Sequence, residues 1–306
     1  MKFTGSSKIV VSLFALGLTL SLALAWLGTM RTASFFESSD KTLGYPRRII
    51  CTVPSLVEIV FALGAGDRVI AVGDFTTYPP EAVKKARVGG YINPNLEQVV
   101  ALRPDLVIVQ GKMDKLLALC DQKKIPLLRV ENDDLSMLFS AIATIGKTVG
   151  CEPEAQRLTE DLRRHLDEIR KQAEAFGKRP KVFLCLDRLS DSLSGFSTAG
   201  GGSFPSELLT IAGGENVFGD VTSSLYPQIS KEALRRRAPD VIIEFRPDSP
   251  MRSIMTELNE TSWHELSSLP AVAHGHVYRV TEDFALIPGP RIVRTAERLL
   301  ELIHRE

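Results

Sequence analysis

One motif occurs twice in this chain, and it constrains the fold more than any other feature of the sequence. The first copy spans residues 95–109 and the second spans residues 230–243. In each, a capping residue is followed by a glutamate, Glu97 or Glu232, and seven residues later by Pro-Asp and an apolar run. This order predicts a short helix, a break and a buried parallel strand.

The spacing of the two copies distinguishes between repeat architectures. They lie about 135 residues apart, whereas solenoid repeats have periods of roughly 20–50 residues. A chain of 306 residues is long enough for two domains. The duplication therefore predicts two similar lobes, each with one acidic residue at a matching place.

Composition limits the kinds of partner. The chain is 44% apolar and 24% charged, which is typical of a globular α/β protein, and its 37 basic residues equal its 37 acidic ones. Without a basic excess, nucleic acid is not expected as a partner. The basic run at residues 235–237 is interpreted as a solvated helix face rather than a binding patch.

The N-terminus predicts export. Lys2 and Lys8 precede an uncharged, largely apolar run of 19 residues at 9–27. This run is longer than the core of a usual signal peptide and close to a membrane span. A cleaved signal at residues 1–30, with Ala23-Leu24-Ala25 as the cleavage site, and a retained membrane anchor both stay open. Either places the rest of the chain in the periplasm or another extracytoplasmic space, after a linker at 31–46.

The first half predicts a parallel sheet with helices on both faces. Ser55 and Glu58 have the spacing of a helix capping box. Strands are expected at 48–53, 68–72, 105–109 and 127–130, and helices after Ser55, after residue 109 as far as about Lys124, and at 135–149. Together these elements form an N-terminal lobe at residues 47–150.

A long amphipathic helix is expected at residues 153–176. Its apolar residues Leu158, Leu162, Leu166 and Ile169 recur at helical spacing. At about 1.5 Å per residue the helix would run roughly 36 Å, enough to span two domains. Residues 151–178 are therefore assigned as the connection between the lobes.

The second half repeats the plan as a C-terminal lobe at residues 179–306. A loop rich in serine and glycine is expected at 187–203. Strands are expected at 181–186, 240–245 and 277–280, and helices at 205–212, 229–237 and 291–304.

Catalytic and metal-binding patterns are missing from the sequence. It contains no GxSxG elbow or HExxH motif, and His274 with His276 makes an incomplete metal site. The glycine run at 199–204 is either a flexible loop or a backbone contact to a ligand. Cys51 and Cys185 fall in predicted strands, and a disulfide between Cys120 and Cys151 stays open. We expect neither an enzyme nor a metal site.

Aromatic residues near strand ends predict a binding site instead. In open α/β sheets ligands bind at the carboxyl ends of the strands. Aromatic loop residues from both lobes would line a cleft suited to a bulky ligand with apolar faces and polar edges. For any single one, local packing is the alternative. They are Phe75, Tyr78, Tyr91, Tyr226 and Phe284.

An ordered set of motifs across residues 47–306 resembles a known family, the substrate-binding proteins of ABC importers for cobalamin and ferric siderophores. Each motif alone would be weak, and their order is specific. The motifs are Val53-Pro54-Ser55, Tyr78-Pro79-Pro80, Val88-Gly89-Gly90, Asn95-Leu96-Glu97, Gly213-Gly214-Glu215-Asn216-Val217-Phe218, Tyr226-Pro227-Gln228 and Pro288-Gly289-Pro290-Arg291.

The resemblance implies a class III, helical-backbone binding protein with two Rossmann-like α/β lobes joined by one long helix and a ligand cleft between them. It implies a monomer without catalytic cofactor that delivers its ligand to a permease and, through it, an ATPase. In such proteins one glutamate on each lobe docks on permease arginines, and by motif these are Glu97 and Glu232. A position near a helix N-terminus is favourable for both in any case, and is compatible with docking.

Three ligands follow from the resemblance. The site looks most like the cobalamin branch, since cobalamin needs aromatic walls more than charge. A ferric siderophore would favour cleft arginines, for which Arg188, Arg246 and Arg291 are candidates, and haem would favour a Tyr or His ligand to iron. The strand-end aromatics and the resemblance together give the expected ligand-binding set: Pro54, Ser55, Phe75, Tyr78, Tyr91, Tyr226, Phe284 and Arg291.

Two further classes stay open beside the transport protein. A metal-dependent enzyme on this fold would need a convergent His, Glu and Cys set, which the sequence does not provide. A membrane-anchored sensor would keep the N-terminal span and lose the permease-docking face.

Overall fold

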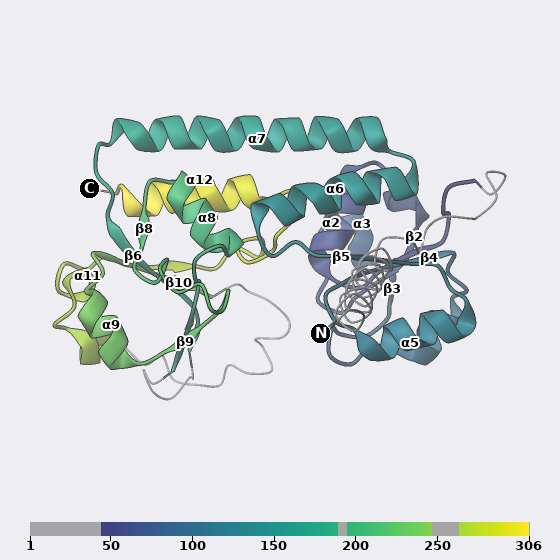
Figure 1. Cartoon of the computed structure of the whole chain (residues 1–306), viewed down its shortest axis with the longest axis horizontal. Helices are drawn as coiled ribbons and strands as arrows, with labels where there is room; N and C mark the ends of the chain where they lie inside the picture. The colour runs from purple at the N-terminus through teal and green to yellow at the C-terminus, as the bar shows by residue number, and fades with distance from the viewer. Residues whose placement is uncertain (1–43, 189–194, 247–262, 306) are drawn as a thin grey trace, which may run out of the picture. The chain divides into compact units, whose positions relative to one another are not determined.

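The computed structural model describes residues 44–188, 195–246 and 263–305. The chain divides into two units after Gly44, and the fold described here is that of the second unit, residues 45–306 (Figure 1). The predicted signal or anchor at residues 1–30 lies outside the described residues. Among those described, no helix is both long enough and apolar enough to cross a membrane.

The N-terminal lobe is built on a five-stranded parallel sheet in the order β3-β2-β1-β4-β5. Alternate residues of the central strands face opposite layers, as the pleat requires. Ile49 of β1 packs into one core cluster with α2 and α6, and Ile50 packs into another with α4 and α5. The elements are β1 (Ile49–Cys51), α2 (Pro54–Ala62), η2 (Gly66–Arg68), β2 (Val69–Val72), α3 (Pro80–Val83), β3 (Ala86–Arg87), α4 (Leu96–Ala101), β4 (Leu106–Gln110), α5 (Asp114–Lys123), β5 (Leu127–Val130) and α6 (Leu135–Val149).

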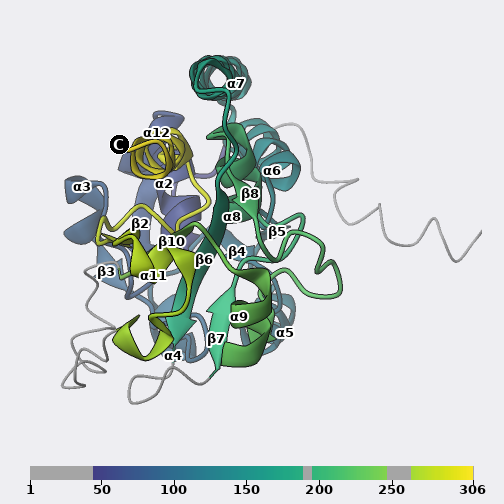
Figure 2. The ribbon, with the colours of Figure 1, turned by 90° about the vertical axis from the view of Figure 1, so that its left-hand side faces the viewer.

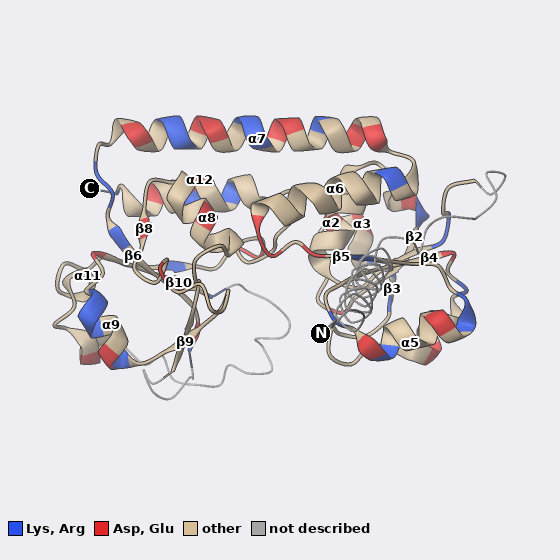
Figure 3. Cartoon of the chain, viewed as in Figure 1, with Lys and Arg blue, Asp and Glu red and all other residues tan. Residues whose placement is uncertain are grey.

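The connecting helix α7 (Glu152–Ala175) confirms the prediction with a shift of one residue at each end. It packs on α6 of the first lobe and on α8 (Phe204–Ile211) and α12 (Ile292–Ile303) of the second, and Figure 2 shows it end-on above α12. Its buried stripe includes Leu162, Leu166 and Ile169. Charged residues cover its other faces along the whole length (Figure 3).

In the described part of the C-terminal lobe, six strands form a mixed sheet in the order β11-β10-β6-β7-β9, with β8 also paired to β6. Strands β6, β10 and β11 are parallel, as expected. An aromatic cluster that includes Phe183, Phe196 and Trp263 fills one face. The remaining elements are β6 (Lys181–Arg188), β7 (Phe196–Thr198), β8 (Glu215–Asn216), β9 (Gln228–Ile229), α9 (Lys231–Arg237), β10 (Val241–Phe245), η3 (Trp263–Leu266), α11 (Pro270–Ala273) and β11 (Val277–Val280).

Two predictions for this lobe are wrong in part. The loop expected at 187–203 contains β7, which pairs antiparallel with β6, and the Thr198 hydroxyl donates a hydrogen bond to the Leu184 carbonyl at 2.8 Å. Residues 189–194 of that loop lie outside the described residues. The helix expected at 229–237 begins at Lys231, because Ile229 belongs to β9.

The duplicated motif forms the same local structure twice. The Asn95 side chain accepts a hydrogen bond from the Gln98 N–H, and the Ser230 hydroxyl accepts one from the Ala233 N–H. Both short helices therefore begin with a side-chain cap, as the sequence predicts.

Each copy also ends in a turn, followed by an aspartate that accepts backbone hydrogen bonds, which the sequence did not predict. The residue before the proline, Arg103 or Ala238, has a left-handed backbone, with φ of 46° and 44°. The aspartate carboxylate then accepts hydrogen bonds from backbone N–H groups at the start of the neighbouring central strand. Asp105 bonds Arg47 and Arg48 at 2.8 Å each, and Asp240 bonds Lys181 at 2.9 Å. The Pro-Asp pair thus fixes the starts of β1 and β6.

The predicted capping box at residues 55–58 is wrong. Helix α2 begins at Pro54, its N-cap is Val53, and no side chain caps it. Proline is suited to the first helical position, where its missing N–H costs nothing. Ser55 therefore lies inside the helix, and Glu58 is 3% exposed and serves another purpose.

All four cysteines are free and buried. The Cys120–Cys151 disulfide, left open by the sequence, is therefore not formed. Cys51 and Cys185 lie in β1 and β6 as core residues, as expected, and burial raises the pKa of both thiols.

Candidate functional site

Most of the predicted ligand residues follow the carboxyl ends of parallel strands. Pro54 and Ser55 come after β1, Phe75 and Tyr78 after β2, Tyr91 after β3, and Phe284 after β11. Tyr226 is the exception, since it precedes β9. Three of the tyrosines are unusually accessible for aromatic residues: Tyr78 is 40% exposed, Tyr91 41% and Tyr226 39%.

Two aromatic side chains of the N-terminal lobe lie over glycines. A Cβ at Gly90 would come within 3.1 Å of the Phe75 ring, and one at Gly111 would come within 2.7 Å of the Tyr91 hydroxyl. Gly111 also has a φ of +61°, which favours glycine. Glycine thus makes room for Tyr91 to reach from the end of β3 to the end of β4.

Arg87 organises the loop that carries Phe75 and Tyr78. Its guanidinium donates to the carbonyls of Gly73 at 2.9 Å, Thr76 at 3.0 Å and Val83 at 3.1 Å. The loop is therefore held by one side chain at several points. No motif in the sequence indicated this role.

Arg291 joins the two lobes. It precedes α12 in the C-terminal lobe, and its guanidinium contacts both carboxylate oxygens of Glu58 in α2, at 2.7 and 3.0 Å. A third hydrogen bond reaches Asp283 at 2.8 Å. The same guanidinium lies 4.3 Å from the Tyr78 ring centroid and 5.5 Å from that of Phe284. Glu58, which the sequence placed in a capping box, is thus half of an ion pair between residues far apart in the chain.

Burial and hydrogen bonding shift the pKa of each residue, Glu58 and Arg291, in opposite directions. Burial raises the pKa of Glu58, and the hydrogen bonds from Arg291 only partly offset it. For Arg291, burial acts to lower the pKa, but the bonds to Glu58 and Asp283 outweigh burial and leave the pKa raised. Arg291 therefore stays charged, with its charge already balanced by carboxylates.

Further hydrogen bonds join the two lobes. We call this contact between the lobes, which includes the Arg291–Glu58 pair, the seam. The Asn132 side-chain amide donates to the Pro288 carbonyl at 2.8 Å, and the Thr77 hydroxyl donates to Asp283 at 3.0 Å. Near the start of α6, the Phe204 N–H donates to the Asp133 carbonyl at 2.9 Å. The residues that follow strands of one lobe therefore touch those of the other.

Acidic side chains gather where β5 ends. Burial raises the pKa of Asp133, and the nearby charges of Glu131 and Asp134 raise it further. Partial burial and the Asp133 charge raise the pKa of Tyr226 to about 12. Tyr226 is thus a neutral phenol near Asp133 at neutral pH.

The other candidate arginines are paired within the C-terminal lobe. Arg188 and Arg246 contact the same oxygen of Glu244, at 2.7 and 2.6 Å, and the side chains of Arg188 and Glu244 are 3% and 4% exposed. Burial opposes ionisation of Glu244, but the two arginines outweigh it and lower its pKa. All three arginines considered for an anionic ligand therefore have a carboxylate partner: Arg291 has two, whereas Arg188 and Arg246 share one.

The two repeated glutamates lie outside this seam. Glu97 and Glu232 are the second residues of α4 and α9 and are exposed. Each helix runs back to the start of the strand that follows it, so both glutamates stand on the carboxyl-end side of their sheets. A hydrogen bond from its own backbone N–H and one from the Ser230 hydroxyl lower the pKa of Glu232.

The glycine run at 199–204 forms an ordered turn. The Gly200 N–H donates to the Leu225 carbonyl and the Gly201 N–H donates to the Val221 carbonyl, each at 2.8 Å. Two of its backbone donors are thus already used within the lobe.

Comparison with known proteins identifies the class. Residues 49–284 match a family model described as periplasmic binding protein. An ABC transporter substrate-binding lipoprotein of Bacillus subtilis strain 168, YvrC, is 30% identical over 264 residues, which cover 85% of this chain and 80% of the relative. The chain belongs to the periplasmic binding protein family.

Solved structures agree on the fold. The periplasmic vitamin B12 binding protein BtuF of Vibrio cholerae aligns with a TM-score of 0.71 at 26% identity, over 86% of this chain and all of that one (100%). The apo form of the periplasmic heme-binding protein RhuT from Roseiflexus sp. RS-1 also has a TM-score of 0.71, at 22% identity, over 84% of this chain and 98% of that one. The α/β fold with two lobes is confirmed.

Proposed function

We propose that this chain is an exported binding protein that captures cobalamin or a related corrinoid between its lobes and delivers it to the permease of an ABC importer. Family membership supports the transport role, and the B12-binding relative supports the ligand. The observation that carries the proposal is the set of three accessible tyrosines, Tyr78, Tyr91 and Tyr226, with Arg291 beside Tyr78 already matched by two carboxylates. The protein would catalyse no reaction.

The charge of the site favours a nearly neutral ligand. An anionic siderophore or the propionates of haem would need free cations, whereas Arg188, Arg246 and Arg291 are paired with carboxylates. The acidic group that follows β5 would repel such ligands further. A corrinoid presents large apolar faces, which Tyr78, Tyr91 and Tyr226 can cover.

Haem is the third candidate, and it is considered because a tyrosine can ligate haem iron. Tyr226 is a candidate iron ligand, but ligation uses the phenolate, and the raised pKa of about 12 opposes its formation. The proposal therefore ranks haem below cobalamin, with a ferric siderophore between them as the anionic alternative.

The remaining predicted residues have supporting roles in this proposal. Pro54 and Ser55 bring the start of α2 to the ligand. Arg291 supports the Tyr78 ring from the other lobe, and Phe284 lies beside Arg291, at the distances given above. The apolar run at residues 9–27 would export the chain, as a cleaved signal or a retained anchor.

Calorimetry tests the ligand. Residues 31–306 are titrated with cyanocobalamin, a ferric siderophore and haem, and we expect cobalamin to bind below micromolar concentration and the others more weakly. Loss of one aromatic wall in Tyr91→Ala should weaken binding about tenfold, a change of about 1.4 kcal/mol.

Tyr45→Ala is the matched control, since Tyr45 is 57% exposed and packs on Gly150, away from the strand ends. It should leave the affinity unchanged. If none of the three ligands bound at micromolar concentration, the proposed function would be wrong.

A further inference from the structure

The two repeated helices present unlike surfaces around the same glutamate. When α4 and α9 are aligned, both begin with a capping residue followed by a glutamate at the second helical position, Glu97 or Glu232. Two positions after the glutamate, both have a fully buried residue. Three other positions of the helices change from apolar to basic. Leu96, Val100 and Ala101 of α4 correspond to Lys231, Arg235 and Arg236 of α9.

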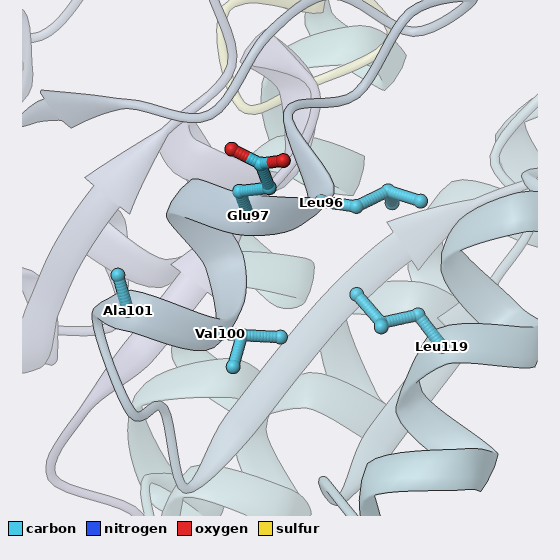
Figure 4. A pocket seen from close by; sticks show the side chains of 5 residues that line it. All are labelled: Leu96, Glu97, Val100, Ala101 and Leu119. Carbon is cyan, nitrogen blue, oxygen red and sulfur yellow. The ribbon is translucent and has the colours of Figure 1, made fainter.

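The apolar residues of α4 form one side of a groove. A surface hollow of about 390 Å³ lies between α4 and α5 and is lined by Leu96, Glu97, Val100, Ala101 and Leu119. Figure 4 shows Val100 and Leu119 facing each other across it, with the Glu97 carboxylate turned away from the apolar side chains. Val100 is 37% exposed and lies among the other apolar side chains of this hollow. The groove is thus an accessible apolar surface with one acid at its rim.

We propose that this groove receives an apolar side chain from the same permease loop that brings a basic residue to Glu97. This inference rests on the proposed transport function and names the contact that one docking face makes. Charge and position support this occupant. None of the described residues forms an ion pair with Glu97, and a partner that reaches both repeated glutamates on the carboxyl-end side of the sheets must pass beside the groove.

The proposal makes the two docking faces unequal. On α4 the contact combines one ion pair with burial of apolar surface, whereas on α9 the basic residues around Glu232 offer only polar contacts. Salt screens exposed charges but not apolar burial. The α4 contact should therefore persist at a salt concentration that weakens the α9 contact.

Binding to the importer tests this. The full chain is loaded with cobalamin and presented to the permease and ATPase complex through which the host takes up cobalamin, purified in lipid nanodiscs, and affinity is read by interferometry. Val100→Arg copies the residue at the matching position of α9 and should weaken docking at least tenfold, equivalent to about 1.4 kcal/mol. Leu119→Gln, from the opposite wall, should act in the same direction. The affinity for cobalamin should stay unchanged in both.

Arg235→Val is the matched exchange on α9 and should change docking less than about threefold. Glu97→Arg and Glu232→Arg are included as separate arms and should each abolish docking. If these two reversals abolish docking while Val100→Arg and Leu119→Gln leave it intact, the groove contact is refuted and the proposed function survives.

Two other outcomes would also overturn the inference. Equal losses in Val100→Arg and Arg235→Val would refute the inequality of the two faces. A change in self-association of Val100→Arg, measured by sedimentation, would assign the groove to a second copy of this chain, whose α9 face is basic. If the charge reversals had no effect at all, the docking part of the proposed function would fail with it.

Discussion

Glu58 and Glu244 are both buried carboxylates paired with arginine, yet they hold different parts of the molecule. The partner of Glu58 is Arg291, 233 positions away and in the other lobe. The partners of Glu244 are Arg188, at the end of the adjacent strand, and Arg246, two residues further along the chain. The same pairing thus stabilises one lobe in the second case and joins two lobes in the first.

The two clusters also differ in charge balance. Glu244 has two arginines, and its pKa is lowered despite burial. Glu58 shares its single arginine with Asp283, and its pKa is raised, mainly by burial. A carboxylate with surplus cations is held ionised, whereas one that shares its cation is closer to protonation.

The largest expected effect comes from breaking the cluster between the lobes. Arg291→Met leaves Glu58, whose side chain is 2% exposed, without a cation beside Asp283. Removing one partner of a buried pair costs about 3–5 kcal/mol, and we expect that loss in the free energy of unfolding measured with urea. Arg298→Met, in the helix α12 that Arg291 precedes, is the control, and it should cost less than about 1 kcal/mol because its side chain is 29% exposed. Equal losses in the two variants would contradict the role given to Arg291.

A smaller effect is expected inside the C-terminal lobe. Glu244→Gln keeps the shape of the side chain but weakens its charged hydrogen bonds, each worth about 1.5–3 kcal/mol. The Trp263 indole N–H lies 3.4 Å from Glu244 and its ring stacks on Phe196. The emission of Trp263, measured in residues 31–306, should therefore shift in Glu244→Gln and stay unchanged in Arg291→Met. A shift in both variants would mean that the two clusters are coupled.

The smallest effect is in the pH dependence, where the two glutamates should differ in sign. The folded pKa of Glu244 is lowered, so its contribution is present above the unfolded value near 4.5 and is lost as pH falls through the folded pKa. The folded pKa of Glu58 is raised, so its contribution is present below 4.5 and is lost as pH rises through the folded pKa.

Urea unfolding of wild type, Glu58→Gln and Glu244→Gln between pH 3 and 7 checks this. On acidification, wild type should gain stability relative to Glu58→Gln above pH 4.5, and should lose it relative to Glu244→Gln below pH 4.5. A tenfold difference between the folded and unfolded acid dissociation constants corresponds to about 1.4 kcal/mol of stability. Parallel curves for all three proteins would refute the assignment.

Local signals made much of the fold predictable. Helix α6, strands β5 and β11 and the repeated caps at Asn95 and Ser230 match the expected positions. These elements carry strong apolar periodicity or a cap in the sequence itself. Strand β7 was missed because it follows a run rich in serine and glycine and is stabilised by pairing with β6, a contact that periodicity does not encode.

The candidate site was predictable only as positions along the chain. The sequence placed Tyr78 and Tyr91 near strand ends, because an aromatic residue next to a predicted end of a strand can be recognised from the order of residues alone. The partnership of Glu58 with Arg291 was not visible, since it joins residues 233 apart, and Glu58 instead matched a local capping pattern. Arg87 was missed for the same reason, because its partners are backbone carbonyls that any sequence would supply.

Helix α7 has a consequence for the kinetics of ligand release. It crosses between the lobes as 24 helical residues with a buried stripe along its length, and pairs such as Glu154–Arg157 and Asp161–Arg164 reinforce its outer face. A continuous helix cannot lengthen as a flexible linker can. The two lobes could therefore separate widely only if this helix, which is packed at both ends, were bent. If a ligand binds between these lobes as proposed, restricted opening would slow its release, and the proposed permease would have to bend or displace this helix to speed it.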